Sequence, residues 1–355
     1  MIGNAKRGWI GVDLGAGAVK LAQVVRRRGR LELADAAIVR RGGPGSSDAT
    51  IPEAARSSTD EILGAMSLAQ KARGRPAAGV LSMRDCEFHA LYIKEPNPSP
   101  ETVRRELSSS SPLSWSGRSF DSWSIYHPSD PKNQAVANVG SLSTQATTAD
   151  SAAADIAGAG LDCQSLDGVP TAIARAMRLM VGGRDIPLAA VDLGYGCATY
   201  SAIRGGRPLY VRRLKKRGFQ SNIGQLAEAI DCSEGEALGM LQQHGIASDS
   251  EATTDAAEAI TSVVTPHLSR LETELRRTVA YLQSHRRNLS PVGMVLFGCG
   301  ATTAGLPGVL SRSLDVDVRT WQPDPALLSV PSVLSVPPVL IAPAVAASAL
   351  AWGDK

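Results

Sequence analysis

A short pattern occurs twice in this chain of 355 residues and constrains the fold more than any other feature. Val12 begins VDLGAGAVKLAQVVRRRGRLEL, and Val191 begins VDLGYGCATYSAIRGGRPLYV. Both copies start with V-D-L-G-x-G, continue into a second apolar segment, turn at a basic, glycine-containing stretch and return in a third apolar segment. This matched order predicts strand, glycine turn, strand, turn and strand in each copy. A duplicated α/β unit with a cleft between its halves is therefore expected.

Each copy places an aspartate at the end of a strand and glycines directly after it. The residues of this pattern are Asp13, Gly15, Gly17 and Lys20 in the first copy and Asp192, Gly194 and Gly196 in the second. Backbone N–H groups of such a turn can surround a phosphate, while the carboxylate holds Mg²⁺ through water. One copy alone would be an ordinary D-x-G turn, but two equivalent copies favour a nucleotide cleft. A G-x-G-x-x-G loop and a P-loop are both disfavoured, because Lys20 replaces the last glycine and no G-x-x-x-x-G-K-[ST] occurs at either site.

A third glycine loop follows much later, in FGCGATTAGL from Phe297 to Leu306. It comes after a short apolar strand and before a helix start, and its glycines would let a flat base and a ribose approach the backbone. By itself the stretch is equally well read as an ordinary strand-to-helix turn.

The remaining periodicity predicts helices and strands around these loops. Helices are expected over 52–72, 170–181, 222–244 and 251–287, the last broken or bent near Pro266, and strands over 80–93 and 294–297. The stretch from Pro96 to Gly160 is rich in proline and serine, and its parts 108–111 and 141–154 are expected to be locally mobile. Four aromatic residues in it predict a small core of its own: Trp115, Phe120, Trp123 and Tyr126.

Charge and cysteine content exclude several classes of function. A net charge of +3 is far from the concentrated basicity of a general nucleic-acid binder. The five cysteines stand far apart without a C-x-x-C pair, which favours reduced thiols in a cytoplasm. The first residues lack the apolar core of a signal peptide, so we expect an unexported protein. Two basic runs, Arg26–Arg30 and Arg212–Arg217, follow equivalent strands of the repeat; they are either solvated strand ends or attractors of an anionic membrane surface.

The uncharged stretch from Pro325 to Gly353 is long enough to span a bilayer. Four prolines interrupt it, at positions 331, 337, 338 and 343, and each removes a helix hydrogen bond. Only Ala344 to Trp352 is expected to form an uninterrupted helix, which is too short to cross. We therefore predict an extended connection followed by a buried terminal helix.

The order of the three loops resembles the superfamily of actin, sugar kinases and heat-shock chaperones. Three further stretches resemble the PilM family, cytoplasmic actin-like proteins of type IV pilus assembly related to FtsA and to the type II secretion protein GspL. They are AGLDCQSLDGVPTAIARAM, GQLAEAIDCSEGEALGMLQQHG and LETELRRTVAYLQSH. The resemblance covers nearly the whole chain and is weakest over 96–154.

The resemblance implies an actin-like, ribonuclease H-like duplicated α/β fold with two lobes and a small inserted α+β subdomain. The implied parts are a first lobe over 1–95, the inserted subdomain over 96–166, a connecting helix of the first lobe over 167–187, a second lobe over 188–340 with a helical insertion at about 218–290, and a terminal helix over 341–355 that returns to the first lobe. It further implies a location at the cytoplasmic face of the inner membrane. The implied partner is the cytoplasmic tail of a PilN-like membrane protein, with possible self-association.

The same resemblance implies ATP and Mg²⁺ in the cleft. Asp13 and Asp192 would lie near the metal, and the implied phosphate and adenosine contacts are Gly15, Gly17, Lys20, Gly194, Gly196, Thr199, Gly298 and Gly300. The first loop departs from the family's usual serines, because Ala16, Gly17 and Ala18 offer no hydroxyl. We therefore expect the chain to bind ATP without hydrolysing it efficiently. A nucleotide-binding adaptor is the leading hypothesis. Hydrolysis would need a positioned water and a residue that orients it or accepts its proton, for which Gln164 and Asp167 are the candidates, and an ATPase or small-molecule kinase is the competing hypothesis. A filament-forming protein is the third option.

Overall fold

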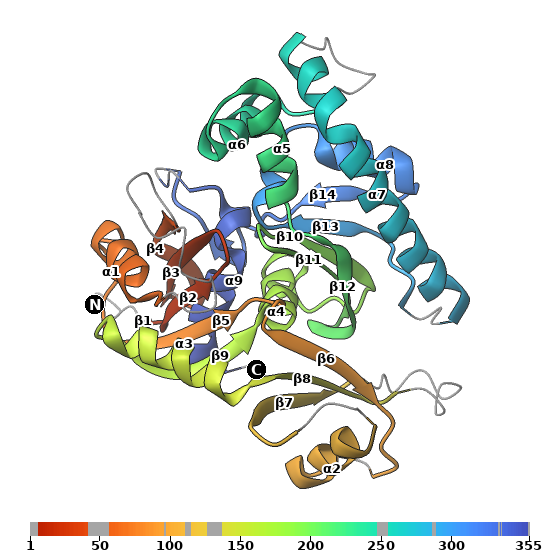
Figure 1. Cartoon of the computed structure of the whole chain (residues 1–355). Helices are drawn as coiled ribbons and strands as arrows, with labels where there is room; N and C mark the ends of the chain where they lie inside the picture. Colours follow the sequence, from red (N-terminus) through yellow and green to blue (C-terminus); the bar gives the residue numbers. More distant parts are fainter. Residues whose placement is uncertain are drawn as a thin grey trace.

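Three sheets organise the parts of the chain that the computed structural model describes, which are residues 6–41, 57–95, 97–110, 115–125, 137–246, 255–285, 289–332, 334 and 336–353. The first has the order β15-β4-β3-β2-β5-β9 with β1 beside β3, the second β12-β11-β10-β13-β14 and the third β6-β8-β7. Figure 1 shows the first two sheets as neighbouring lobes and the third as a smaller unit beneath them.

The first sheet contains the first copy of the repeat. Its strands are β1 (Lys6–Arg7), β2 (Ile10–Leu14), β3 (Ala18–Arg27), β4 (Arg30–Arg40), β5 (Pro76–Leu81), β9 (Asp162–Gly168) and β15 (Leu328–Ser329). β2, β3 and β4 are antiparallel neighbours, whereas β5 and β9 continue the sheet in parallel with β2. Helices α1 (Thr59–Leu68) and α3 (Ala146–Gly158) cover one face, and α9 (Pro338–Ala349) lies against β2 and β3 on the other. Alternate residues of each strand therefore enter two apolar layers.

The second sheet repeats this arrangement, as the duplicated pattern predicted. Its strands are β10 (Leu188–Leu193), β11 (Cys197–Arg204), β12 (Arg207–Arg217), β13 (Met294–Phe297) and β14 (Val318–Thr320). β10, β11 and β12 are antiparallel, and β13 runs parallel to β10, so strand order and direction match those of the first copy. The helices of this half are α4 (Val169–Val181), α5 (Gln220–Ile230), α6 (Glu234–Gln243), α7 (Asp255–His285) and α8 (Leu306–Leu314).

The third sheet forms the inserted subdomain, with limits that differ from the expected 96–166. It contains β6 (Cys86–Leu91), β7 (Arg118–Ser124) and β8 (Val139–Gln145) with α2 (Pro100–Ser110), so it begins before 96. The expected mobility over 141–154 was wrong, because those residues form β8 and most of α3. Trp115 is buried and Phe120 packs beside it in a small core; Tyr126 and Ser111 lie outside the described residues. At the other end, β15 lies within the expected 188–340 but joins the first sheet.

Most predicted helices are present with altered limits. Residues 52–56 of the first predicted helix lie outside the described part, and of the remainder only Thr59–Leu68 is helical, as α1. The segment 222–244 is two helices, because Asp231 adopts a left-handed conformation and Ser233 begins α6 with a capping box to Glu236. The expected break near Pro266 is absent from the described helix α7, which runs through the proline.

The C-terminal helix α9 is longer than predicted, because it begins at Pro338 and includes Pro343. Proline fits the first turn of a helix without loss, and the interior Pro343 is tolerated where packing on both lobes fixes the helix. β2 receives α9 at glycine positions: a Cβ on Gly11 would lie 1.8 Å from the carbonyl oxygen of Ala344. Ser348 Oγ accepts from Val24 N at 2.9 Å and donates to Trp9 O at 2.5 Å. Within the described residues, no helix is long and apolar enough to cross a membrane.

The two basic runs do not occupy equivalent positions, which corrects the expectation from sequence. Arg26–Arg30 spans the turn between β3 and β4. Arg212–Arg217 lies inside β12, where Arg212 donates to Glu274 and Thr278 at 2.7 Å each. The side chains of residues 215–217 lie outside the described part.

Candidate functional site between two glycine loops

Strand register places a lysine directly beside the first aspartate. Asp13 on β2 pairs with Lys20 on β3, and Lys20 Nζ lies 2.7 Å from Asp13 Oδ2. Burial lowers the pKa of Lys20, but the carboxylates of Asp13 and Asp192 together raise it by more than burial lowers it. The pKa of Lys20 therefore lies above its ordinary value. The lysine is therefore charged at neutral pH and is shared by two acidic residues.

In the second copy the same register position holds a hydroxyl. Asp192 on β10 pairs with Thr199 on β11, and Thr199 Oγ1 lies 3.8 Å from Cys197 Sγ. Burial raises the pKa of Asp192 to about 7, with Lys20 lowering it and Asp13 raising it. Asp192 thus depends on Lys20 of the opposite lobe for its compensating charge.

The two glycine loops touch across the cleft. A Cβ on Gly17 would lie 2.5 Å from the ring of Tyr195, and a Cβ on Gly196 would lie 2.7 Å from the Ala16 side chain. Arg84 also reaches Gly196, because the same Cβ would lie 3.0 Å from the Cδ atom of Arg84. Glycine at these two places lets the loops approach closely, as the sequence predicted for a cleft between the halves.

The third loop joins the same site. Gly298 has φ of 80°, and a Cβ there would lie 2.5 Å from Asp192 Oδ1. Gly300 packs against the Phe219 ring, and Cys299 Sγ lies 3.5 Å from Leu193 O. Burial raises the pKa of Cys299 to about 12, so it is an uncharged thiol. The structure therefore brings together all ten residues predicted for the site from all three loops: Asp13, Gly15, Gly17, Lys20, Asp192, Gly194, Gly196, Thr199, Gly298 and Gly300.

Arg41 orients the first loop and was missed by sequence reasoning. Its Nε donates to Gly15 O at 2.9 Å, its backbone N–H donates to Gly17 O at 3.0 Å, and one terminal nitrogen donates to Ser58 Oγ at 2.7 Å. In a trans peptide the next N–H points opposite to the carbonyl, so the Ala16 N–H points away from Arg41. No local motif marks Arg41, because the strand pairing of β3 and β4 brings it back from 26 residues along the chain.

The start of α5 orients the second loop in the same way. Gly194 O accepts from Phe219 N at 2.9 Å, and Tyr195 O accepts from Gln220 N at 3.0 Å. The N–H groups of Tyr195 and Gly196 consequently point away from α5. Both loops thus direct their carbonyls into the protein and their following amides to the other side, an arrangement that suits an anion.

Helix α6 ties the second and third loops together. Near its start, Tyr195 Oη donates to Glu234 Oε2 at 2.5 Å, and near its end Gln242 Nε2 donates to Thr302 Oγ1 at 3.0 Å. Ile246 N donates to Ala304 O at 3.0 Å just beyond the helix. Helix α6 and the residues just after it therefore pack along one side of the third loop.

The two residues considered for activating a water have other roles or positions. Asp167 Oδ1 accepts from Gly168 N at 2.8 Å and from Thr171 Oγ1, and its Oδ2 lies 2.7 Å from Arg175. Asp167 thus lies just before the start of α4, where its carboxylate is engaged by hydrogen bonds and an ion pair. Gln164 is exposed and donates to Asp162 O at 3.4 Å.

The donor set also bears on a metal ion. Among the described residues, no group of three or more His, Cys, Asp and Glu side chains is close enough to hold one directly. Asp13 and Asp192 are two carboxylates that share one lysine, so these side chains suit a cation held largely through water and ligand oxygens.

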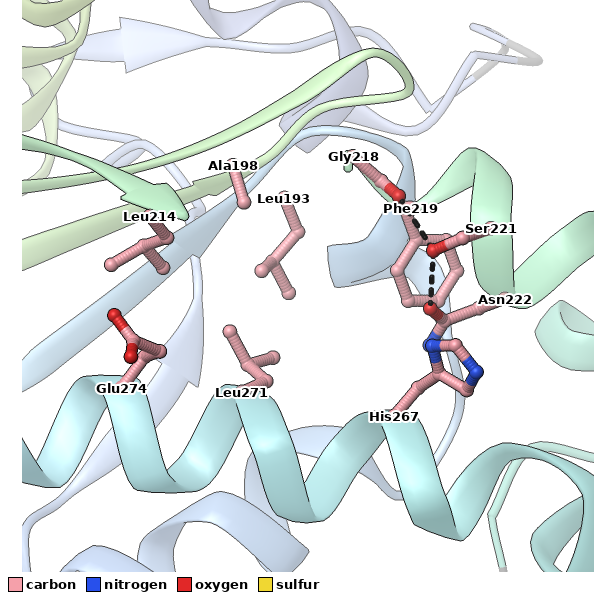
Figure 2. Close-up of a pocket in the computed structure, with 10 residues that line it drawn as sticks. All are labelled: Leu193, Ala198, Leu214, Gly218, Phe219, Ser221, Asn222, His267, Leu271 and Glu274. Atoms are coloured by element: carbon pink, nitrogen blue, oxygen red, sulfur yellow. Dashed lines mark hydrogen bonds between the residues drawn. The ribbon is translucent and has the colours of Figure 1, made fainter. Parts of the chain in front are cut away.

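A separate cavity lies in the second lobe, behind the second loop (Figure 2). Leu193, Ala198, Leu214 and Leu271 form its apolar part, and the side chains at its rim include Asn222, His267 and Glu274. Gly218 connects this cavity to the site, because a Cβ there would lie 2.2 Å from Tyr195 O. The cavity was not expected from the sequence, since its lining comes from five separate elements, β10, β11, β12, α5 and α7.

The duplicated sheets and the two facing loops form an actin-like fold. Comparison with family models and with curated proteins gives no match. Among solved structures, the chain is similar to the PilM–PilN type IV pilus biogenesis complex, with a TM-score of 0.74 and 21% identity over 97% of this chain and 98% of that one.

Two further solved structures share the fold. One is the ethanolamine utilization protein EutJ from Carboxydothermus hydrogenoformans, with a TM-score of 0.54 and 14% identity over 98% of this chain and 91% of that one. The other is the MamK double helical filament, with a TM-score of 0.52 and 12% identity over 99% and 100%. At these identities the likeness establishes the fold, and the functions of the neighbours are their own.

Proposed function

We propose that this chain is an actin-like nucleotide-binding adaptor of a type IV pilus or type II secretion assembly. It would act at the cytoplasmic face of the inner membrane and bind the cytoplasmic tail of a PilN-like partner. The observation that carries the nucleotide part is the convergence of three glycine loops on Asp13, Lys20 and Asp192. The likeness to a solved PilM–PilN complex over nearly the whole chain supports the adaptor part.

The residues present fit ATP with Mg²⁺. Lys20 and the outward amides of both loops would contact the phosphates, and Gly298 and Gly300 would let the adenosine approach the third loop beside α6. Asp13 and Asp192 would hold Mg²⁺ through water. When bound, the metal neutralises phosphate charge, which would also compensate Asp192.

Holding a nucleotide is favoured over cleaving it. Ala16 stands where the first loop faces the second, and its methyl group cannot donate to a phosphate oxygen. Each absent hydroxyl removes a hydrogen bond to a charged group, worth about 1 kcal/mol or somewhat more. The carboxylate of Asp167 is already engaged by α4 and Arg175, so it is a poor general base.

Isothermal titration tests both halves of the proposal. We expect Mg-ATP to bind the wild-type chain and to bind Lys20→Met at least tenfold more weakly, whereas Lys71→Met, the same change on the surface, should bind like wild type. A peptide of the cytoplasmic tail of the PilN-like protein from the same organism should bind as well. Absence of both interactions would contradict the proposal.

A phosphate-release assay separates the adaptor from an enzyme. Robust turnover by the wild type that disappears in Asp192→Ala would support an ATPase or kinase instead. We expect release close to the buffer control for both proteins.

A further inference from the structure

The far end of the first sheet carries a concentration of positive charge. Lys6 on β1 pairs with Arg26 on β3, Arg27 pairs with Arg30 across the β3–β4 turn, and Arg28 lies in the turn itself. Together with Arg7, these six exposed side chains form what we call the basic edge.

Little negative charge offsets this edge. Arg27 Nε lies 3.4 Å from Glu32 Oε2, in a pair that is largely exposed on both sides. Arg7 donates to the carbonyl of Lys71 at 3.1 Å, which brings that lysine and the neighbouring Arg73 to the same end. Besides Glu32, Asp35 lies at this end, where its Oδ2 accepts from Lys71 N at 2.5 Å, so the six cations of the edge outnumber the neighbouring carboxylates and leave a local excess of positive charge.

The turn geometry gives no reason for an arginine at its centre. Arg28 and Gly29 have φ values of 50° and 83°, as in a tight hairpin turn that favours Asn, Asp or Gly at both positions. The corresponding turn of the second copy is Gly205–Gly206, with φ values of 57° and 73°. The first copy therefore places a long cation at the tip of the hairpin at a conformational cost that its counterpart avoids.

A half-buried tryptophan adjoins these charges. Arg26 lies over the Trp352 ring, with its guanidinium carbon 4.9 Å from the ring centroid. An indole beside several cations suits the interface between lipid headgroups and acyl chains. β3 begins at the first glycine loop and is ten residues long, which separates the edge from the cleft by about 30 Å. Binding at this end would leave the cleft open.

We propose that the basic edge binds the surface of an anionic lipid bilayer. The other basic run does not contribute in the same way, because Arg212 is committed to Glu274 and Thr278. The edge uses exposed guanidinium groups on a sheet end, and Trp352 adds an aromatic group suited to a headgroup layer. Lipid is therefore favoured over nucleic acid as the occupant.

Vesicle co-sedimentation of the full chain tests this surface. We expect binding to vesicles of 30% phosphatidylglycerol in phosphatidylcholine at 0.1 M NaCl, loss of binding at 0.5 M NaCl, and no binding to pure phosphatidylcholine. The double variant Arg28→Glu with Arg30→Glu should bind at least tenfold more weakly, since each cation near such a surface contributes about fivefold.

Two controls keep the proposal open to contradiction. Arg105→Glu with Arg270→Glu makes the same change of charge on exposed helix positions elsewhere and should bind vesicles like wild type. Arg28→Lys with Arg30→Lys should also retain binding. Equal loss in the Arg105 and Arg270 variant, no binding to anionic vesicles, or tighter binding to a short DNA duplex than to vesicles would each overturn it. ATP binding by the Arg28 and Arg30 variant should be unchanged, so the outcome is independent of the proposed function.

Discussion

The two copies of the repeat share a backbone but divide the chemistry between them. In the first, Asp13 has Lys20 as its strand partner, 2.7 Å away. In the second, Asp192 faces Thr199, and its pKa is raised to about 7 by burial. The same register therefore gives the aspartate of the first lobe a positively charged partner and leaves the aspartate of the second lobe without one on its neighbouring strand. Charge balance in the cleft becomes a property of both lobes together.

The copies also differ in what covers their central strand. Gly11 in β2 is matched by Ala190 in β10, one residue before the shared V-D-L-G pattern. Gly11 meets the backbone of α9, whereas Ala190 accommodates a methyl group in a buried position. The first lobe thus requires glycine to seat a helix that the second lobe does not have at that position.

We expect the largest loss of stability from a substitution that removes this difference in packing. Gly11→Ala would place Cβ 1.8 Å from Ala344 O, so α9 must move. We expect a loss of about 4 kcal/mol or more in the free energy of unfolding. Ala190→Gly, the reverse exchange in the second copy, should cost about 1 kcal/mol. Urea unfolding of both variants measures the contrast, and similar losses would contradict it.

Removing the shared cation should have the next largest effect. Lys20→Met leaves Asp13 and Asp192 without their positive partner, at a cost of about 3 kcal/mol near pH 8. The loss should shrink at pH 5, where Asp192, whose pKa is raised to about 7, is protonated and needs no positive partner. Thr199→Val, at the matching position of the second copy, should cost about 1 kcal/mol. Unfolding curves at both pH values decide this, and a loss independent of pH would argue against charge as the cause.

A smaller effect concerns the pH dependence of Asp192. Its folded pKa of about 7 lies above the ordinary 3.8, so the folded state holds the extra proton between these values. Stability should therefore fall as pH rises from about 4 to 7, by about 2 kcal/mol relative to Asp192→Asn, after allowance for solvent screening. Thermal melting across this range measures the difference between the two proteins. A constant difference would show that Asp192 is ionised throughout.

The smallest effect is a gain in affinity. Ala16→Ser adds a hydroxyl to the first loop where it faces the second, and we expect ATP to bind about fivefold more tightly, or about 1 kcal/mol. Ala34→Ser, on a strand away from the cleft, is the matched control. Titration calorimetry reports both, and unchanged affinity in Ala16→Ser would mean that this loop does not face the phosphates.

The strands and glycine loops of the repeat could be predicted from the sequence. Contacts between residues that are far apart in the sequence could not. The strands around Val12 and Val191 could be predicted because matched apolar segments flank each glycine loop. Arg41 could not, because β4 brings it to Gly15 only after the sheet forms. Pro343 was expected to lie before a helix that begins at Ala344, yet α9 includes it, since burial against two lobes outweighs the lost hydrogen bond. The serine-rich composition of 141–154 concealed the strand β8, whose residues 139–144 are all buried, and the helix α3 that follows it.

A crystal structure of the chain with Mg-ATP tests the central claim most directly. The account predicts phosphates between the loops at Gly15–Gly17 and Gly194–Gly196, in contact with Lys20, and adenosine beside Gly298–Gly300 and α6. A nucleotide held by one lobe alone, or bound in the cavity between α5 and α7, would contradict it.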